Sequence, residues 1–341
     1  MNARQKLLDH PYWVASYPSK MRLVRVFDFP PEANPFAKDG VVIRIAAAPG
    51  ESPFHKGPMA RQGILEGVRK GLIGPDTIVV EATSGNTGLG MAVVCTNLGL
   101  NFVAVIPNDI PESKISGIRA LGEHVRFESP KAGETTVGCA RRLGKQEGSH
   151  NPDQYAGWWN PQSHYEHLMP QLFSQTQASI FAAPGGTTGT CIAAKKFALD
   201  NRLSMEVVPV LCAEDQEIPA VRTLARVKKD IRLPWEAYFD EEKDLQFATR
   251  HASFFCSFFT WRFVPVQLGP SFGAAFVGAL KFLREHKEAG TLDQFRKKDG
   301  KIYVVVFGPD DYRAYVALYL DKPFYGKDFR SSNLLDFIDW V

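Results

Sequence analysis

Small and polar residues follow the apolar run at residues 77–80 and form a loop suited to binding an anion. The loop is Thr83-Ser84-Gly85-Asn86-Thr87-Gly88, and a helix-like run from Leu89 to Leu98 comes directly after it. A strand that passes into a helix through such residues exposes several backbone N–H groups, and the helix dipole favours negative charge there. The loop therefore predicts a carboxylate or phosphate site, although the same residue types also cap ordinary helices.

A second glycine-rich run has the character of a phosphate site. Ala183-Pro184-Gly185-Gly186-Thr187-Thr188-Gly189-Thr190 lies between an apolar run at 177–182 and a helix-like run at 191–199. Its clustered N–H and hydroxyl donors make it the better phosphate cradle of the two loops. Neither loop has the G-x-G-x-x-G spacing of a dinucleotide site or the G-x-x-x-x-G-K-[ST] spacing of a P-loop, which disfavours NAD and ATP as ligands.

Length and composition indicate a large α/β protein. The chain has 341 residues, of which 45% are hydrophobic and 23% charged, enough for two domains or one large unit. The net charge of +3 is small and dispersed, so we predict no nucleic-acid partner. No apolar run approaches the roughly 18 residues of a membrane span, and the polar N-terminus lacks a signal-peptide core, so we predict no membrane partner.

The five cysteines are scattered along the chain and odd in number, at positions 95, 139, 191, 212 and 256. No two of them have the C-x-x-C spacing of a redox or zinc motif. This pattern predicts reduced, mostly buried thiols in a cytoplasmic protein, with neither a disulfide framework nor a metal site.

Hydrophobic periodicity predicts strands that alternate with helices, which is typical of βαβ units and a mainly parallel sheet. Strands are expected at residues 23–26, 41–45, 77–80, 102–107, 125–127, 177–182, 207–211 and 303–307. Helices are expected at residues 59–70, 89–98, 113–121, 135–146, 191–199 and 273–285. Residues 1–20 are expected to wrap the surface, and residues 329–341 to form a C-terminal appendage.

In its motifs the chain resembles the fold-type II pyridoxal-phosphate enzymes of the cysteine synthase and cystathionine β-synthase family. T-S-G-N-T-G at 83–88 matches that family's substrate-carboxylate loop, and Lys56 precedes a helix-like run that stops at Gly71-Leu72, as the family's lysine does. Further matching segments are 19–26, Gln154 with 160–166, 185–187 and 269–275. The matches keep the family's order from about residue 20 to residue 316, which makes the resemblance stronger than any one motif.

The resemblance implies pyridoxal 5'-phosphate as the cofactor and assigns a role to each loop. Lys56 would form the Schiff base with the cofactor and carry the proton transfers. Asn86 would bind the ring hydroxyl of the cofactor. The cofactor phosphate would be held by Gly185, Gly186, Thr187 and Thr188. The substrate carboxylate would be held by Thr83, Ser84, Gly85, Thr87 and Gln154.

The resemblance also implies the architecture. It is the two-domain, tryptophan synthase β-like fold, with mainly parallel sheets, helices on both faces and the cofactor in the cleft. Residues 46–170 would form a smaller domain with the carboxylate loop. Residues 10–45 and 171–328 would form a larger domain with the phosphate loop, followed by the tail at 329–341. A homodimer is implied as well.

The sequence departs from the family pattern near these loops. Gly57-Pro58 follows Lys56 where the family usually has Asp-Arg, and Pro184 cannot donate an N–H group to the phosphate loop. Residues 213–232 lack the glycine-rich loop that normally closes over the substrate. Residues 251–263 are unusually aromatic, and such runs more often form core or interface than a substrate pocket.

A further departure places Asp311 where family members have a serine that faces the pyridine nitrogen of the cofactor. A carboxylate there would stabilise the protonated ring nitrogen and strengthen electron withdrawal. Racemisation, γ-elimination or retro-aldol cleavage would then become easier. We therefore predict that Asp311 contacts the ring nitrogen, with an aspartate in a surface turn as the alternative.

The resemblance implies a pyridoxal-phosphate dependent transferase or lyase of amino-acid metabolism. The predicted reaction is β-elimination or β-replacement on a serine- or cysteine-type amino acid through an aminoacrylate, as in cysteine synthases. Asp311 and the missing closing loop keep a racemase, lyase or deaminase open as an alternative. Pro184 and the changed residues after Lys56 keep open a catalytically inactive homologue that acts as a binding subunit.

Overall fold

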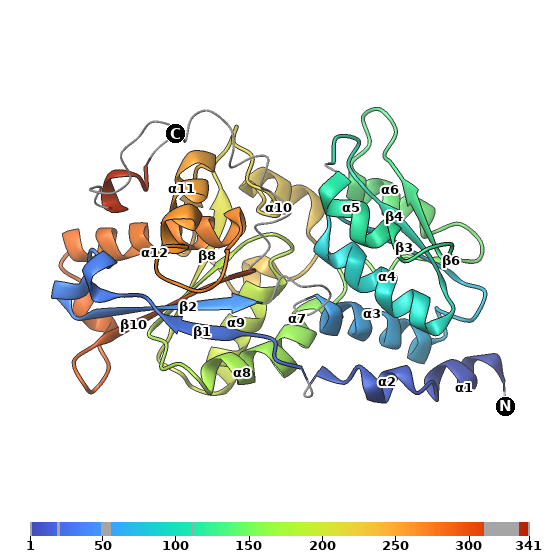
Figure 1. Ribbon diagram of the computed structural model, residues 1–341, viewed down its shortest axis with the longest axis horizontal. Helices are drawn as coiled ribbons and strands as arrows, with labels where there is room; N and C mark the ends of the chain where they lie inside the picture. Colours follow the sequence, from blue (N-terminus) through green and yellow to red (C-terminus); the bar gives the residue numbers. More distant parts are fainter. Residues whose placement is uncertain (1, 19–20, 49–55, 111, 310–333, 340–341) are drawn as a thin grey trace. The chain divides into compact units, whose positions relative to one another are not determined.

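The computed structural model describes residues 2–18, 21–48, 56–110, 112–309 and 334–339, and it divides the chain into two compact units (Figure 1). The first unit comprises Met1–Leu23 and Glu51–His167, and the second comprises Val24–Gly50 and Leu168–Val341. This division differs from the predicted one at residues 10–23, which belong to the first unit rather than to the larger domain. It also assigns 46–50 to the second unit, because strand β2 continues to Ala48, and it assigns 168–170 to the second unit as well.

The sheet of the first unit has four parallel strands in the order β5-β4-β3-β6. Its strands are β3 (Ile78–Ala82), β4 (Asn101–Val105), β5 (Val125–Glu128) and β6 (Ser149–His150). β3 pairs with β4 along its whole length but with β6 at Ile78 and Val79 alone. The C-terminal end of β3 therefore has no strand partner on the β6 side within the described part of the chain.

Helices surround this sheet. They are α1 (Ala3–Leu8), α2 (Tyr12–Ala15), α3 (Gly57–Lys70), α4 (Asn86–Leu98), α5 (Glu112–Arg119), α6 (Thr136–Leu143), α7 (Trp159–Ser163) and a π-helix from His164 to Leu168 that reaches the boundary between the units. α3 and α4 both end at glycines in the left-handed region, Gly71 (φ 75°) and Gly99 (φ 69°). Glycine adopts this conformation without a Cβ clash, which explains why both helices stop where the sequence predicts.

The sheet of the second unit has six strands in the order β1-β2-β10-β7-β8-β9. The strands are β1 (Arg25–Asp28), β2 (Val41–Ala48), β7 (Ile180–Pro184), β8 (Glu206–Cys212), β9 (Gln246–Ala248) and β10 (Ile302–Pro309). β1 is antiparallel to β2, and the other pairs are parallel. The helices are α8 (Met169–Phe173), α9 (Gly189–Asp200), α10 (Leu224–Asp230), α11 (Arg250–Thr260) and α12 (Pro270–Glu288). Short 3₁₀ turns lie at Pro31–Ala33, Ala37–Asp39, Trp235–Ala237, Leu292–Phe295 and Leu334–Asp336.

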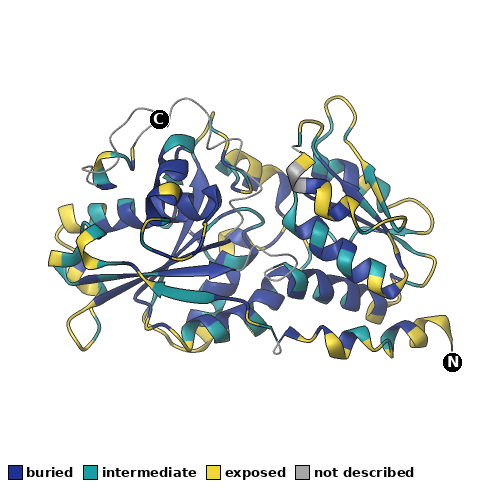
Figure 2. Cartoon of the chain, in the orientation of Figure 1, coloured by how far each residue is buried: buried dark blue, intermediate teal, exposed yellow. Residues whose placement is uncertain are grey.

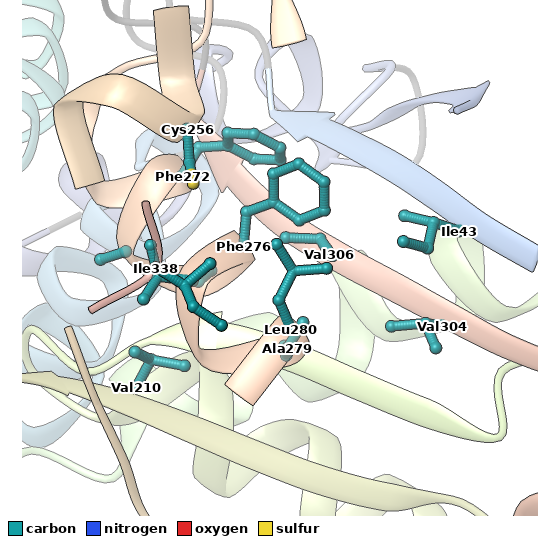
Figure 3. Close-up of a cluster of buried hydrophobic side chains, with 14 of the residues drawn as sticks. Ile43, Val210, Cys256, Phe272, Phe276, Ala279, Leu280, Val304, Val306 and Ile338 are labelled. Atoms are coloured by element: carbon teal, nitrogen blue, oxygen red, sulfur yellow. The ribbon is translucent and has the colours of Figure 1, made fainter. Parts of the chain in front are cut away.

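Helix α12 forms the centre of the second unit's core. Figure 3 shows Phe276 and Leu280 packed beside Val306 and Ile43 of the sheet. The small residues of α12 permit this close packing. A Cβ at Gly273 would lie 1.7 Å from a backbone oxygen of α11, and one at Gly278 would lie 2.3 Å from a side chain of β8. The aromatic run at 251–263 contributes mainly to this core, in agreement with the more frequent role of such runs.

The described part of the C-terminal tail belongs to the same core and is not an appendage. Leu334 and Ile338 are buried, and the rings of Phe337 and Phe255 stack with centroids 4.2 Å apart. Asp339 forms an ion pair with Arg284 at 2.6 Å. The tail thus joins the side of the unit formed by α11 and α12.

The N-terminal residues form two short helices that pack on α3. Leu7 and Trp13 are buried, whereas most of α1 is exposed (Figure 2). Arg61 of α3 donates to the carbonyl oxygen of Trp13 at 2.7 Å and to Ser16 Oγ at 3.3 Å. These contacts explain why residues 10–23 belong to the first unit.

The state of the cysteines and the length of the apolar helices were both predicted from the sequence. All five cysteines are buried free thiols, as predicted. None of the described helices is long and apolar enough to cross a membrane.

Candidate active site

Thr83 shapes the predicted carboxylate loop from inside. Its side chain is buried, and its Oγ1 accepts hydrogen bonds from the N–H groups of Gly85 at 3.1 Å and Gly88 at 2.8 Å. Gly85 has φ 145° and ψ −96°, a conformation that favours glycine. A Cβ at Gly88 would lie 2.5 Å from Thr83 Cγ2. The two glycines are therefore required for the turn that brings β3 into α4.

The same loop leaves backbone donors available for a ligand. The N–H groups of Ser84 and Thr87 donate to no acceptor among the described residues. Both precede the first intrahelical hydrogen bonds of α4, where the helix dipole favours an anion. The side chain of Ser84 is exposed, and Asn86 is the first residue of the helix. The loop fits a carboxylate, which accepts several hydrogen bonds at once.

Gln154 lies against this loop, as the resemblance implied. Thr87 Oγ1 donates to Gln154 Oε1 at 2.9 Å, and Gln154 Nε2 donates to the carbonyl oxygen of Ala82 at 2.6 Å. Gln154 is buried, with 2% of its surface exposed. The structure therefore brings Gln154 and Thr87 together across 67 residues of sequence.

Lys56 lies directly before helix α3 and beside the start of α4. Its Nζ lies 3.8 Å from Met59 Sδ. Gly57 and Pro58 occupy the first turn of α3, where proline is tolerated because the N–H groups have no intrahelical partner there. A Cβ at Gly90 of α4 would lie 3.0 Å from the carbonyl oxygen of Lys56, so the two helices touch at this point. The departure at Gly57-Pro58 is thus compatible with the lysine's position.

The second loop forms an N–H cradle at the start of α9. Pro184 is the last residue of β7, and Gly185 N–H donates to the carbonyl oxygen of Val210 at 2.8 Å. The donors come after these residues: the N–H groups of Gly186, Thr188, Gly189 and Thr190 have no acceptor within the described ranges. Because Pro184 precedes the cradle, its missing N–H group does not weaken it. A Cβ at Gly186 would lie 2.6 Å from the carbonyl oxygen of Ala220, so this position requires glycine.

Thr188 provides a direct test of whether this loop fits a phosphate. Its hydroxyl is buried and has no hydrogen-bond partner among the described residues, and its backbone has φ 65°. A buried hydroxyl without a partner and a non-glycine residue in the left-handed region both cost stability. Phosphate oxygens would satisfy the hydroxyl together with the four N–H groups. The residues present therefore fit the phosphate of the predicted cofactor.

The predicted site residues fall into two groups. Lys56, the 83–88 loop and Gln154 belong to the first unit, and the 185–188 loop belongs to the second.

The segment 213–232, which was predicted to lack a closing loop, packs on the phosphate loop. The N–H group of Arg222 donates to the carbonyl oxygen of Gly185 at 2.9 Å. Asp311 lies outside the described residues, so its contact with the ring nitrogen stays a prediction.

Two residues near the site were not predicted from the sequence. Gly90 determines how closely α4 approaches Lys56, and nothing in a helical run marks a glycine as a contact point. Glu81 is fully buried beside Gln154, and its Oε2 accepts the Gln154 N–H group at 3.2 Å. A single carboxylate directly after the apolar strand predicted at 77–80 was a usable signal, because charged residues are rarely buried without a purpose.

A lysine and a loop of donors in the first unit, and a loop that fits a phosphate in the second, are the kinds of group that an enzyme using pyridoxal phosphate needs. Residues 58–242, more than half of the chain, match the family described as "Pyridoxal-phosphate dependent enzyme". The chain belongs to this family, which confirms the predicted cofactor. It also confirms the prediction of a pyridoxal-phosphate dependent enzyme.

Similar proteins support the narrower resemblance. The chain is 28% identical over 156 residues to cysteine synthase B of Pseudomonas aeruginosa, covering 45% of this chain and 52% of that protein. It is 36% identical over 138 residues to cystathionine beta-synthase of Oryctolagus cuniculus, covering 37% of this chain and 24% of that protein. The matched regions thus span about half of the cysteine synthase and a quarter of the cystathionine beta-synthase.

Solved structures confirm the predicted fold class. The structure of an O-acetylserine dependent cystathionine beta-synthase from Helicobacter pylori matches with a TM-score of 0.71 and 21% identity, covering 91% of this chain and 98% of that one. A cysteine synthase from Entamoeba histolytica matches with a TM-score of 0.73 and 14% identity, covering 94% and 93%. At these identities the likeness shows the fold, which is that of the two-domain fold-type II enzymes.

Proposed function

We propose that this chain catalyses β-elimination or β-replacement on a serine- or cysteine-type amino acid. The observation that carries the proposal is the contact between Lys56 and the helix that follows the carboxylate loop, at Gly90. A substrate whose carboxylate binds the loop would have its Cα close to the lysine. The similarity to proteins named cysteine synthase B and cystathionine beta-synthase supports this reaction class.

The residues of the first unit have the following proposed roles. The N–H groups of Ser84 and Thr87 hold the substrate carboxylate, together with the second Nε2 proton of Gln154, while the Thr87 hydroxyl keeps its bond to Gln154 Oε1. Thr83 and Gly85 keep the loop in shape. Lys56 would hold the cofactor through Nζ, and the same amine would take the proton from the substrate Cα. The Cβ substituent would then leave with its bonding electron pair. In a replacement a nucleophile would bond to Cβ and Lys56 would return the proton to Cα.

The cofactor contacts are proposed from the family resemblance and from the donors of the loop after β7. The phosphate would be held by the N–H groups of Gly186, Thr188, Gly189 and Thr190 and by the Thr188 hydroxyl, within the loop that also contains Gly185 and Thr187; the Gly185 N–H group is already bonded to Val210 and does not take part. Asn86 would bind the ring hydroxyl. Bound pyridoxal phosphate supplies the electron withdrawal that makes the Cα proton acidic. Asp311 is proposed to contact the ring nitrogen. If it does, the site would also favour a racemase, lyase or deaminase reaction, which is the second candidate function.

An absorbance experiment tests the proposal. Wild-type protein with added pyridoxal phosphate is expected to show the visible absorption of lysine-bound cofactor, and Lys56→Ala is expected to lose it. Lys70→Ala is a matched control, since Lys70 is an exposed lysine at the other end of α3, paired with Glu66. O-substituted serines should lose their Cβ substituent when incubated with wild type or with Lys70→Ala. They should keep it when incubated with Lys56→Ala.

The other outcomes separate the alternatives. Racemisation of the amino acid with retention of its Cβ substituent would favour the second candidate. Wild-type protein that shows no cofactor absorption would contradict an enzyme and favour a binding subunit. The cradle after Pro184 argues against that outcome, because its donors are all in place.

We also propose that the protein is a cytoplasmic homodimer. The homodimer rests on the resemblance to the cysteine synthases, and the location rests on the five free, buried thiols. Sedimentation velocity should give twice the chain mass of 38.0 kDa. A concentration-independent monomer would contradict the homodimer.

A further inference from the structure

Glu81 is a buried carboxyl group that none of the proposed roles uses. None of its surface is exposed. Its Oε1 accepts the N–H group of Ala82 at 3.0 Å, and its Oε2 accepts the N–H group of Gln154 at 3.2 Å. Burial, together with the nearby Asp153, raises the pKa of Glu81 well above the usual value of a carboxyl group. A group that is costly to bury is thus kept at the end of β3, directly before the carboxylate loop.

The position of Glu81 in the sheet explains what the carboxyl group does. Thr83 N–H donates to the carbonyl oxygen of Val105 in β4 at 2.8 Å. Because backbone groups alternate sides along a parallel strand, the N–H and C=O groups of Ala82 face the side of β6. β6 ends after His150 and does not reach them.

Two side chains take the place of the missing strand. Glu81 Oε1 accepts the N–H group of Ala82, and Gln154 Nε2 donates to the carbonyl oxygen of Ala82 at 2.6 Å. Glu81 then holds the main chain of Gln154 through Oε2, so that the backbone and side chain of residue 154 are fixed to β3 at two points.

The remaining polar groups of Gln154 are also bonded. Its Oε1 accepts the hydroxyl proton of Thr87 at 2.9 Å, and its carbonyl oxygen accepts from Asn160 Nδ2 at 2.8 Å. The turn before it is held by Arg141, which donates to Asp153 Oδ2 at 2.7 Å. The bond to Glu81 ties the main chain of this turn to the strand leading into the carboxylate loop, and the bond from Gln154 Nε2 to Ala82 ties the side chain to the same strand.

We propose that Glu81 is a positioning residue for the substrate-carboxylate pocket. It fixes the main chain at Gln154 so that the amide stays against Thr87. This inference rests on the proposed function, which assigns Gln154 and Thr87 to the substrate carboxylate. Glu81 contacts the pocket residues and not the substrate.

Amide hydrogen exchange of the cofactor-loaded protein tests the contact itself. In Glu81→Gln one of the two acceptors becomes an NH₂ group, and in Glu81→Leu both are lost. We expect faster exchange in the 151–157 peptide for both variants, more for Glu81→Leu, while the peptide over β4 keeps its protection. Val68→Ala, a buried residue of α3, is the control for a general loss of stability. Unchanged exchange at 151–157 in both Glu81 variants, or an equal increase in Val68→Ala, would overturn the inference.

Ligand binding tests the consequence for the pocket. We expect the dissociation constant of L-serine, followed by the cofactor spectrum, to rise about tenfold in Glu81→Gln. The constant for L-serinamide, which lacks the carboxylate, and the affinity for pyridoxal phosphate should stay unchanged. In Gln154→Ala the further substitution Glu81→Gln should add little, because the side-chain amide that Glu81 is proposed to keep in place is already missing. Equal losses for serine and serinamide, or additive effects, would contradict a positioning role.

The two tests keep the inference separate from the proposed function. A wild-type protein whose spectrum responds to no amino acid would contradict the proposed function. Hydrogen exchange at 151–157 would still decide whether Glu81 holds Gln154 in place.

Discussion

The backbone at Gly90 lies against the backbone at Lys56. A Cβ on Gly90 would lie 3.0 Å from the Lys56 carbonyl oxygen and 3.2 Å from Ala60 Cβ. Gly90 lies about one turn into α4, whose N-terminus carries the loop of donors, and Lys56 directly precedes α3. Since contacts of 3.0–3.4 Å are tighter than ordinary packing, a side chain at position 90 has to move the two helices apart.

Gly90→Ala should therefore weaken cofactor binding more than it weakens the fold. Separation of α4 from α3 moves Lys56 away from the carboxylate loop, so we expect a several-fold lower affinity for pyridoxal phosphate and a larger loss for the amino acid. Both are measured by titration of the cofactor spectrum. Gly117→Ala is the matched control, because a Cβ there meets its first neighbour at 3.5 Å. In a helix that change should be neutral or stabilise by about 0.5–1 kcal/mol. Equal cofactor affinity in the two variants would show that the close approach is unimportant.

Thr188→Val should separate the stability of the free protein from its affinity for the cofactor. The Thr188 hydroxyl is buried without a partner among the described residues, so its removal should leave the thermal stability of the cofactor-free protein unchanged or higher. A hydrogen bond to a charged group contributes about 1.5–3 kcal/mol, so the dissociation constant of pyridoxal phosphate should rise about 10- to 100-fold.

Thr176→Val provides the control for this experiment. The Thr176 hydroxyl is also buried but donates to the carbonyl oxygen of Leu172 at 3.1 Å. Its loss should lower thermal stability and leave the cofactor affinity unchanged. If Thr188→Val behaved in the same way, the Thr188 hydroxyl would not face the phosphate.

Ile338→Ala should destabilise the second unit although the residue lies three positions from the end of the chain. Ile338 is fully buried beside α12, so the substitution leaves a cavity and should cost about 2–5 kcal/mol. Leu199→Ala is the control, since Leu199 is 62% exposed and its loss should change stability by less than about 0.5 kcal/mol. Urea unfolding measures both. A small effect at Ile338 would show that the C-terminal segment contributes little to the core.

Long periodic segments of this fold could be predicted from the sequence, and short ones could not. The helix expected at 59–70 is α3, and the strand expected at 303–307 is β10. β6 and β9 have two and three residues, too few to show any hydrophobic period. The unit to which residues 10–23 belong depends on the contact between Trp13 and Arg61, which are 48 residues apart.

The site residues, too, could be predicted only where a local sequence pattern specifies them. The family motif gives the loop at 83–88, because each of its residues is set by local backbone geometry. A carboxylate at the end of an apolar run marks Glu81 as unusual, but its partner Gln154 lies far along the chain. The contact of Gly90 with Lys56 likewise arises from packing and has no local signal. The placement of Pro184 ahead of the donors likewise depends on where β7 ends.

Glu81 should also make the stability of the protein depend on pH. Its pKa is raised by burial and by Asp153, so the folded chain keeps this proton at pH values where the unfolded chain, with a carboxyl pKa of 4.5, has lost it. The free energy of unfolding should therefore fall as pH rises above the unfolded value, and this contribution ends once the folded pKa is passed. The slope from one such group is at most about 1.4 kcal/mol per pH unit.

Glu81→Gln should remove this contribution, because glutamine does not titrate. Urea unfolding from about pH 5 to about pH 8 should show a steeper fall in stability for wild type than for the variant. Glu134→Gln is the control: hydrogen bonds from Arg142 lower the pKa of Glu134 to about 2, so it is ionised in both states across this range. Its slope should match that of wild type. Identical slopes for wild type and Glu81→Gln would mean that Glu81 is ionised in the folded protein, held by its two N–H donors despite its burial.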